Sequence, residues 1–151
     1  MEKSASVKWQ GNILQGAGFI STESGALSEV RYGFQTRFEG KPGTNPEELI
    51  AAAHASCFAM AVASELSKRK LNPKLIEVDA KVKLEKIEGM YAITAVHLNL
   101  TADVPDAGGK LFAEAVNFAK ENCPVSKLLN AKITMESELL SALPKDQLVG
   151  L

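Results

Sequence analysis

The sequence has only two cysteines and two histidines, and it has no excess of charge of either sign. Its 17 basic and 18 acidic residues are interspersed, so no row of cations is present to neutralise nucleic-acid phosphates. The opening MEKSASVKWQGN has no apolar run that could form a signal-peptide core, and no uninterrupted membrane-length stretch follows. We therefore expect a cytoplasmic protein with neither nucleic acid nor a membrane as a partner.

The length and composition predict one domain over residues 1–151, because 46% hydrophobic content is enough for an ordinary buried core. The most apolar segment, residues 49–63, contains His54 and is flanked by Glu48 and Glu65. It is too short to span a bilayer and predicts a helix buried in protein.

Alternating and helical patterns of apolar residues predict an α+β protein, with runs of strands rather than regular βαβ units. The Asn45-Pro46-Glu47 sequence is typical of a helix start, and Asn72-Pro73 of a helix stop. The predicted elements are strands at 6–9, 18–21 and 32–38, a helix from 46 to about 70, strands at 76–85 and 91–101, helices at 111–119 and 125–129, and a strand at 133–139.

Both cysteines are candidate functional residues, because a cytosolic protein keeps its thiols reduced unless they cycle catalytically. Cys57 lies among alanines on the predicted long helix, where an inert buried thiol is the ordinary explanation. Burial raises a thiol's pKa, so a reactive thiolate there would need a nearby cation. The candidate is Arg37 at the end of the third predicted strand, although polar neighbours make a solvated strand face its ordinary explanation.

Glu47 has an ordinary role as a first-turn carboxylate that stabilises its helix. If Glu47 and Cys57 share one helix, their ten-residue spacing separates them by about 15 Å along its axis. A site that used both would therefore draw them from different subunits, or link them through a residue such as Arg37.

Cys123 precedes Pro124, which can begin a short helix, and a thiol at a helix N-terminus has its thiolate favoured. Physical reasoning alone thus makes Cys123 the better candidate for a thiol of low pKa that is accessible for disulfide exchange. A redox pair with Cys57 and an unpaired role both stay open at this point.

Two other chemistries use the same residues. His54, Cys57, His97 and Cys123 could form a zinc site, but no short-spaced ligand pair of the usual kind is present. His54 and Cys57 could form an acyl-transfer nucleophile, but no oxyanion hole or orienting third group can be identified.

Five motifs occur together in this sequence: TESG at 22–25, YGFQTRFEG at 32–40, GTNPEEL at 43–49, HASCF at 54–58 and CPVS at 123–126. Together they resemble the OsmC/Ohr superfamily, the osmotically inducible protein C and organic hydroperoxide resistance proteins. The resemblance covers nearly the whole chain, and the RFEG segment with His54 looks more like the osmotically inducible branch.

The resemblance implies an OsmC-like fold with antiparallel sheets and a central buried helix, in an intertwined homodimer with two sites at the subunit interface. It implies that Cys57 is the peroxidatic thiolate and Cys123 the resolving cysteine, which overrules the preference for Cys123. Arg37 and Glu47 would hold and activate the thiolate.

The implied activity is a thiol-dependent peroxidase that reduces organic hydroperoxides, and hydrogen peroxide less efficiently, in oxidative or osmotic stress defence. Its reductant would be a dithiol, for example of the dihydrolipoyl type, and no cofactor or metal is expected. The alternative is a thiol redox sensor or ligand-binding dimer that uses the same cysteines without turnover.

Overall fold

In the computed structural model, which describes residues 1–140, the chain divides into two compact units. The first comprises residues 1–49 and the second begins at residue 50, so the boundary lies within helix α2 (Pro46–Lys68). Strands and helices occur in both units, which confirms the α+β class. The single domain expected from chain length stays a prediction.

The first unit contains a three-stranded antiparallel sheet of β1 (Ala5–Gln10), β2 (Ala17–Thr22) and β3 (Val30–Tyr32). Gly18 on the central strand pairs with Trp9 on one side and with Tyr32 on the other. The two aromatic rings lie 5.6 Å apart, and a Cβ on Gly18 would collide with the Tyr32 ring. A glycine at this position therefore allows the two rings to pack across the sheet.

The third predicted strand is wrong beyond Tyr32, because residues Phe34–Phe38 form the short helix α1. Phe34 and Phe38 are four residues apart, and in a helix this spacing stacks their rings with centroids 4.9 Å apart. The Thr36 hydroxyl also accepts a hydrogen bond from the Gly33 backbone N–H at 2.9 Å. These local interactions favour the helix over the strand, so Arg37 lies on α1.

The second unit contains a mixed three-stranded sheet. The two strands predicted at 76–85 and 91–101 are β4 (Leu75–Ile87) and β5 (Met90–Asp103). They form an antiparallel hairpin that turns at Glu88 and Gly89, both with positive φ. Strand β6 (Lys132–Leu139) pairs with β5 in parallel, which differs from the wholly antiparallel expectation. A parallel neighbour needs a long crossover, and helices α3 (Gly109–Asn122) and α4 (Pro124–Leu128) provide it.

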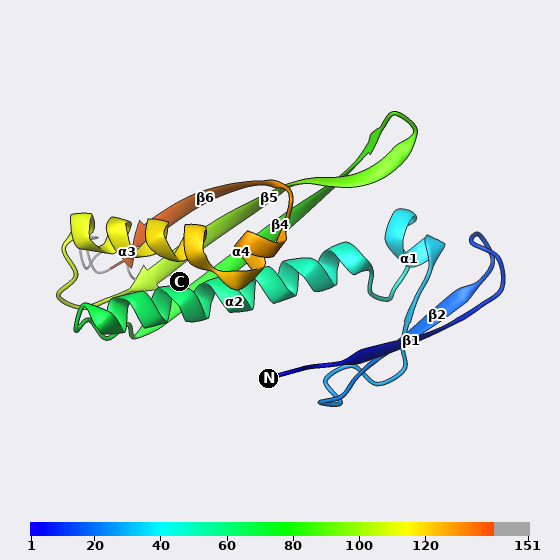
Figure 1. Ribbon diagram of the computed structural model, residues 1–151, viewed down its shortest axis with the longest axis horizontal. Helices are drawn as coiled ribbons and strands as arrows, with labels where there is room; N and C mark the ends of the chain where they lie inside the picture. The colour runs from blue at the N-terminus through cyan, green and yellow to red at the C-terminus, as the bar shows by residue number, and fades with distance from the viewer. Residues whose placement is uncertain (141–151) are drawn as a thin grey trace. The chain divides into compact units, whose positions relative to one another are not determined.

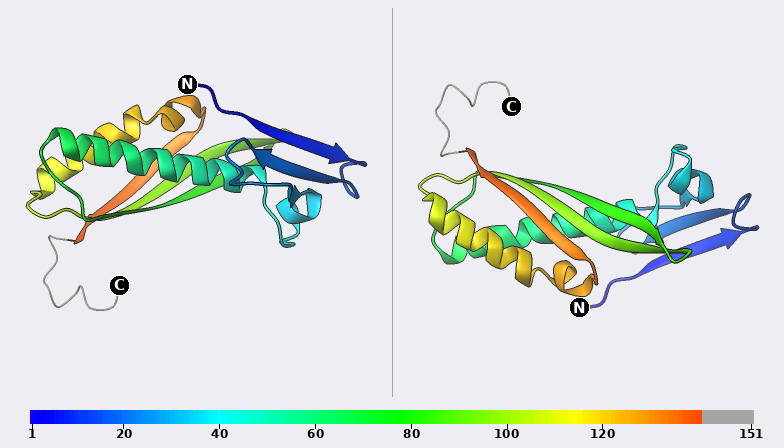
Figure 2. Two further views of the ribbon diagram at one scale, coloured as in Figure 1. Left: turned by 90° about the horizontal axis from the view of Figure 1, so that it is seen from below. Right: turned by 90° about the horizontal axis from the view of Figure 1, so that it is seen from above.

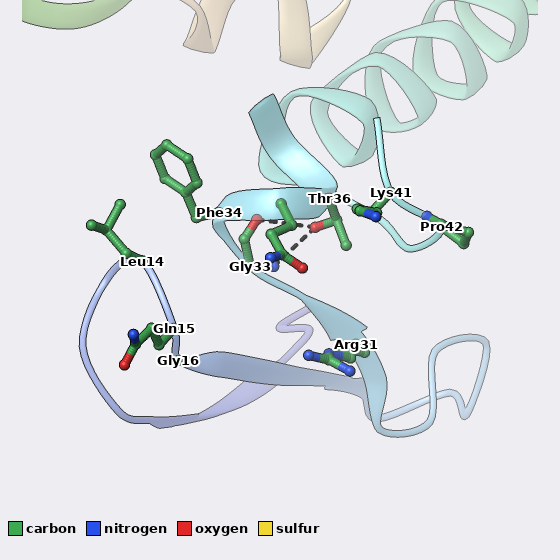
Figure 3. Close-up of a pocket in the computed structure, with 10 residues that line it drawn as sticks. Leu14, Gln15, Gly16, Arg31, Gly33, Phe34, Thr36, Lys41 and Pro42 are labelled. Carbon is green, nitrogen blue, oxygen red and sulfur yellow. Dashed lines mark hydrogen bonds between the residues drawn. The ribbon is translucent and has the colours of Figure 1, made fainter. Parts of the chain in front are cut away.

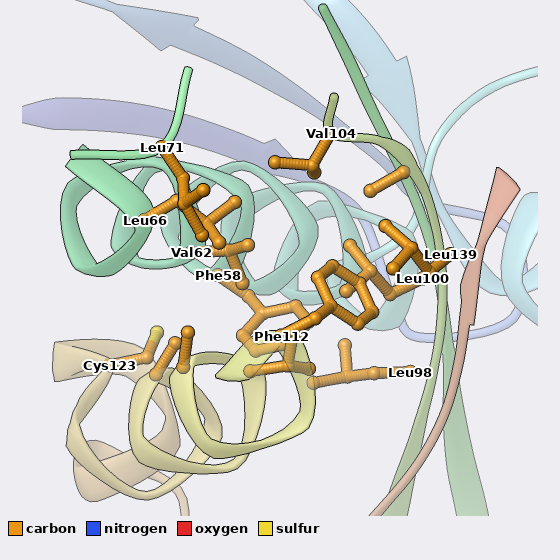
Figure 4. Close-up of a cluster of buried hydrophobic side chains, with 14 of the residues drawn as sticks. Phe58, Val62, Leu66, Leu71, Leu98, Leu100, Val104, Phe112, Cys123 and Leu139 are labelled. Carbon is orange, nitrogen blue, oxygen red and sulfur yellow. The ribbon is translucent and has the colours of Figure 1, made fainter. Parts of the chain in front are cut away.

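Within the second unit, α2 and α3 lie side by side over one face of this sheet (Figures 1 and 2). Their apolar side chains meet those of β5 in a continuous core (Figure 4). On α3 the buried face includes Phe112 and Val116, whereas Leu111 is 37% and Phe118 47% exposed. The fully buried apolar core side chains of α2 and β5 are Phe58, Val62, Leu66, Val96, Leu98, Leu100 and Ala102.

The face of α2 opposite this core is exposed in the single chain. Ala53, Ser56, Met60 and Ser64 recur along it at helical spacing, and Met60 is 75% exposed. Helix α2 has 23 residues, and an 18-residue window within it has a mean hydropathy of 1.5, so its length and composition would suffice for a membrane span. The prediction from sequence considered only the apolar residues 49–63, which are too short for this. A core helix of a water-soluble protein has the same properties, and His54, Phe58 and Val62 are here buried against protein.

The core predicts a strong effect of truncating β5. Leu98→Ala removes a fully buried side chain, so we expect the free energy of unfolding to fall by about 2–5 kcal/mol. Glu77→Ala, at an exposed position of β4, should change it by less than about 0.5 kcal/mol. Urea denaturation at a fixed protein concentration measures both, and equal effects of the two substitutions would contradict this description of the core.

Candidate active site

The two cysteines are in contact, although 66 residues separate them in the sequence. The Cys123 thiol donates a hydrogen bond to Cys57, with 3.1 Å between the sulfurs. Cys57 projects from the middle of α2, whereas Cys123 is the residue between α3 and α4. A disulfide needs about 2.05 Å between sulfurs, so an approach of about 1 Å would join them.

Cys123 is fully buried among core side chains (Figure 4), so the expectation that it is accessible for exchange is wrong. Cys57 is only half-buried and is the thiol that solvent can reach. Burial, with a further contribution from neighbouring Cys123, raises the pKa of Cys57. A hydrogen bond from the backbone of Val125 acts in the opposite direction.

The backbone hydrogen bond from Val125 to Cys57 was not predicted from the sequence. Its contribution comes from the backbone at the first turn of α4, so no side-chain pattern could have revealed it. The side chain of the next residue, Ser126, hydrogen-bonds His54 Nε2 at 2.8 Å in the buried interior. The CPVS motif contains both residues, but neither was predicted to have a role.

Arg37 and Glu47 form a second pair, within the first unit. Arg37 Nε donates to Glu47 Oε2 at 3.0 Å, and Arg37 Nη2 donates to Glu47 Oε1. The carboxylate side chain is only 13% exposed and the guanidinium 31%. This two-point contact fixes the plane of the guanidinium, which one contact would leave free to rotate.

Arg37 also lines a small pocket of about 50 Å³ whose walls are mostly aromatic and aliphatic. Its guanidinium carbon lies 5.1 Å from the centre of the Phe38 ring, within the range of a cation–π interaction. The other wall residues are Trp9, Ile13, Tyr32, Gly33, Phe34 and Pro46.

A larger cavity, of about 510 Å³, shares Gly33 and Phe34 with this pocket, and neither Arg37 nor Glu47 lines it. Leu14 and Gln15 line it from the β1–β2 loop, Arg31 from β3, and Lys41 from the segment after α1 (Figure 3). Figure 3 also shows the Thr36 and Gly33 hydrogen bonds that hold the first turn of α1, from which Arg37 projects.

The zinc site considered from sequence is not assembled in residues 1–140, where no three His, Cys, Asp or Glu side chains are grouped to hold a metal ion. His97 uses both ring nitrogens, with Thr134 Oγ1 at 2.7 Å and Asn99 Oδ1 at 3.0 Å. Of the four predicted site residues, the structure joins Cys57 to Cys123 and Arg37 to Glu47.

The sequence model of the family described as OsmC-like protein matches residues 38–138, which is more than half of the chain. The chain belongs to the OsmC-like protein family. Peroxiredoxin OsmC of Escherichia coli strain K12 is 44% identical over 141 residues, covering 93% of this chain and 99% of that protein. Organic hydroperoxide resistance protein OhrB of Bacillus subtilis is 30% identical over 123 residues, covering 82% and 89%.

Solved structures agree with the OsmC-like fold. The crystal structure of OhrB from Bacillus subtilis has a TM-score of 0.67 and 29% identity, covering 89% of this chain and 97% of that one. An OsmC-like protein of unknown function from Vibrio cholerae has a TM-score of 0.73 at 19% identity, covering 91% and 99%, and it supports the fold alone. The superfamily resemblance and the fold class drawn from the sequence are thus confirmed.

The different exposure of the two thiols predicts the order of their alkylation in this OsmC-like protein. With limiting iodoacetamide, half-buried Cys57 should react about tenfold faster than fully buried Cys123 in the reduced protein. Peptide mass spectrometry after a rapid quench measures both rates. Cys57→Ser tests whether Cys123 stays slow without its neighbour, and faster labelling of Cys123 in the natural protein would contradict the structure.

Proposed function

We propose that this protein is a thiol-dependent peroxidase that reduces organic hydroperoxides to alcohols, with hydrogen peroxide as a poorer substrate. The observation that carries the proposal is the 3.1 Å contact between Cys57 and Cys123. Relatives named peroxiredoxin OsmC and organic hydroperoxide resistance protein OhrB support a peroxide-related reaction. Two thiols in contact can together donate the two electrons that reduce one peroxide, and they form a disulfide in doing so.

The proposed reaction has three balanced steps. The Cys57 thiolate attacks a peroxide oxygen, the O–O bond breaks, and the departing alkoxide takes a proton to leave as an alcohol. Cys57 becomes a sulfenic acid, which condenses with the Cys123 thiol to form a disulfide and release water. An external dithiol then reduces the disulfide and is itself oxidised to a disulfide.

Arg37 and Glu47 would supply the cation that Cys57 needs. Because burial raises the pKa of Cys57, a positive charge beside the sulfur would restore its thiolate at neutral pH. The guanidinium would also stabilise the negative charge that develops on the departing oxygen. Glu47 would hold the guanidinium in one plane through its two-point contact.

The preference for organic substrates is proposed from the pocket beside Arg37. Its aromatic and aliphatic walls would bury hydrocarbon, which favours a peroxide with an organic group over hydrogen peroxide. Two apolar residues that follow Cys57 on α2 do not line this pocket within the single chain. Phe58 is fully buried in the core and Met60 is 75% exposed.

An intertwined homodimer is part of the proposal. Ten residues of α2 separate Glu47 from Cys57, which is about 15 Å along a helix, so one site would take these residues from two subunits. The exposed face of α2 that carries Met60 supports the same arrangement, because a second chain would cover it. The central helix would then be buried on both sides.

We propose a dithiol of the dihydrolipoyl type as reductant and a role in oxidative or osmotic stress defence, in the cytoplasm.

The second candidate function is a thiol redox sensor or ligand-binding dimer, which would use the same pair of thiols without turnover. Steady-state consumption of peroxide with a dithiol separates the two functions, because a sensor reacts only once per protein.

The cysteine roles predict different losses for two substitutions. With cumene hydroperoxide and dihydrolipoamide, Cys57→Ser should abolish turnover because the nucleophile is lost. Cys123→Ser should retain one rapid oxidation, after which the sulfenic acid of Cys57 persists and can be trapped with dimedone. Peroxide loss and intact-protein mass measure both outcomes. Equal turnover by Cys57→Ser and the natural protein would overturn the assignment of the nucleophile.

Arg37 should not be replaceable by lysine. Arg37→Lys keeps a charge but loses the two-point contact with Glu47, so we expect about a 10²-fold fall in kcat/KM. Arg37→Gln should fall at least as far, and the pH midpoint for alkylation of Cys57 should rise because its cation is absent. An unchanged midpoint in Arg37→Gln would contradict a role beside the thiolate.

Co-expression tests the shared site. A dimer of one Cys57→Ser subunit and one Arg37→Gln subunit would contain one complete site if the two residues come from different chains. Turnover should then recover to about half that of the natural dimer. No recovery in a purified mixed dimer would show that each site takes both residues from one chain.

A further inference from the structure

Two side-chain contacts join α2 to the segment that contains Cys123 and α4. Cys57 contacts Cys123, and His54 contacts Ser126. In each segment the two contacting residues are three positions apart. The His54 ring is fully buried and the Ser126 side chain nearly so. The thiol contact therefore has a buried hydrogen bond one helical turn away on the same face of α2.

This hydrogen bond has no substitute within residues 1–140. His54 Nδ1 is buried without a hydrogen-bond partner among these residues, so Ser126 provides the only such bond of the ring. Burial lowers the pKa of His54, which keeps the imidazole neutral. If α4 moved away from α2, both ring nitrogens would be left unpaired in the interior, and buried polar groups without partners are strongly disfavoured.

Helix α4 is short and is held by apolar packing together with this one buried polar bond. It has five residues, Val125 and the following Leu129 pack against the core, and Leu128 is 80% exposed. Its first turn also contributes the Val125 backbone bond to Cys57. A helix of this length is not stable by itself and depends on its packing. The His54–Ser126 bond adds a directional contact to the apolar packing, so its loss should loosen α4 beside Cys123.

We propose that His54 and Ser126 are positioning residues whose hydrogen bond holds the two thiols in register for disulfide formation. This inference rests on the proposed function for its role in turnover. The effect on the thiol pair itself can be tested without turnover. In the oxidised protein the disulfide holds α4 close to α2 covalently, whereas in the reduced protein the hydrogen bond helps to hold it there. Removing the bond should therefore make the disulfide harder to form.

The test is the thiol–disulfide equilibrium of the protein in glutathione buffers, without peroxide. Oxidised glutathione takes two hydrogens from Cys57 and Cys123, giving one protein disulfide and two reduced glutathione molecules. Acid quenching, alkylation and mass spectrometry give the equilibrium constant. We expect Ser126→Ala to lower it about tenfold, and the matched control Ser67→Ala, at an exposed position of α2, to leave it within about twofold.

Two further variants separate positioning from general damage. Ser126→Thr retains the hydroxyl, so its equilibrium constant should stay within about threefold of the natural value. His54→Leu should match Ser126→Ala, and the double variant should fall little further, because both substitutions remove the same bond. An effect of Ser126→Ala below twofold, a tenfold fall in Ser126→Thr, or a double variant that shows the product of the single effects would each overturn the proposal.

These outcomes are independent of the peroxidase test. If the natural protein forms the disulfide and Ser126→Ala weakens it, but no hydroperoxide is turned over, the positioning role stands and the proposed function fails. If turnover is found but the equilibrium constants do not change, only the positioning role fails.

Discussion

The packing of α2 against the junction between α3 and α4 is the constraint on which the chemistry of this protein depends. Apolar side chains of α2, α3 and β5 form one buried core, and Cys123 is part of it. Because interiors are close-packed, the helices have little freedom to slide. Cys57, one residue before buried Phe58, is thereby held against Cys123, although the two lie 66 residues apart.

The same packing sets the electrostatics of the thiols. It removes water from Cys57 and raises its pKa, so the core alone produces a poorly ionised thiol. A thiol so placed can be a nucleophile only with help from a cation, and the first unit holds a guanidinium in a fixed plane through Glu47. The dimer in our proposal brings these two requirements together.

Much of the fold could be predicted from the sequence because its signals are local. Alternating apolar residues predicted the strands β4 and β5, and Asn45-Pro46 predicted the start of α2. Two predictions failed for different reasons. The segment around Arg37 alternates like a strand, but the ring contact between Phe34 and Phe38 favours a helix. The parallel partner of β5 depends on a crossover whose direction no local pattern encodes.

For the candidate site, the sequence by itself determined the residue types: two thiols, an arginine, a first-turn glutamate, and motifs typical of one family. The sequence could not determine which thiol faces solvent, and the dipole argument favoured Cys123, which is in fact fully buried. Only the tertiary structure decided the contact of the sulfurs, the backbone bond from Val125 and the pairing of His54 with Ser126. Each of these depends on how two distant segments pack, and packing geometry has no signature in the spacing of residues along one chain.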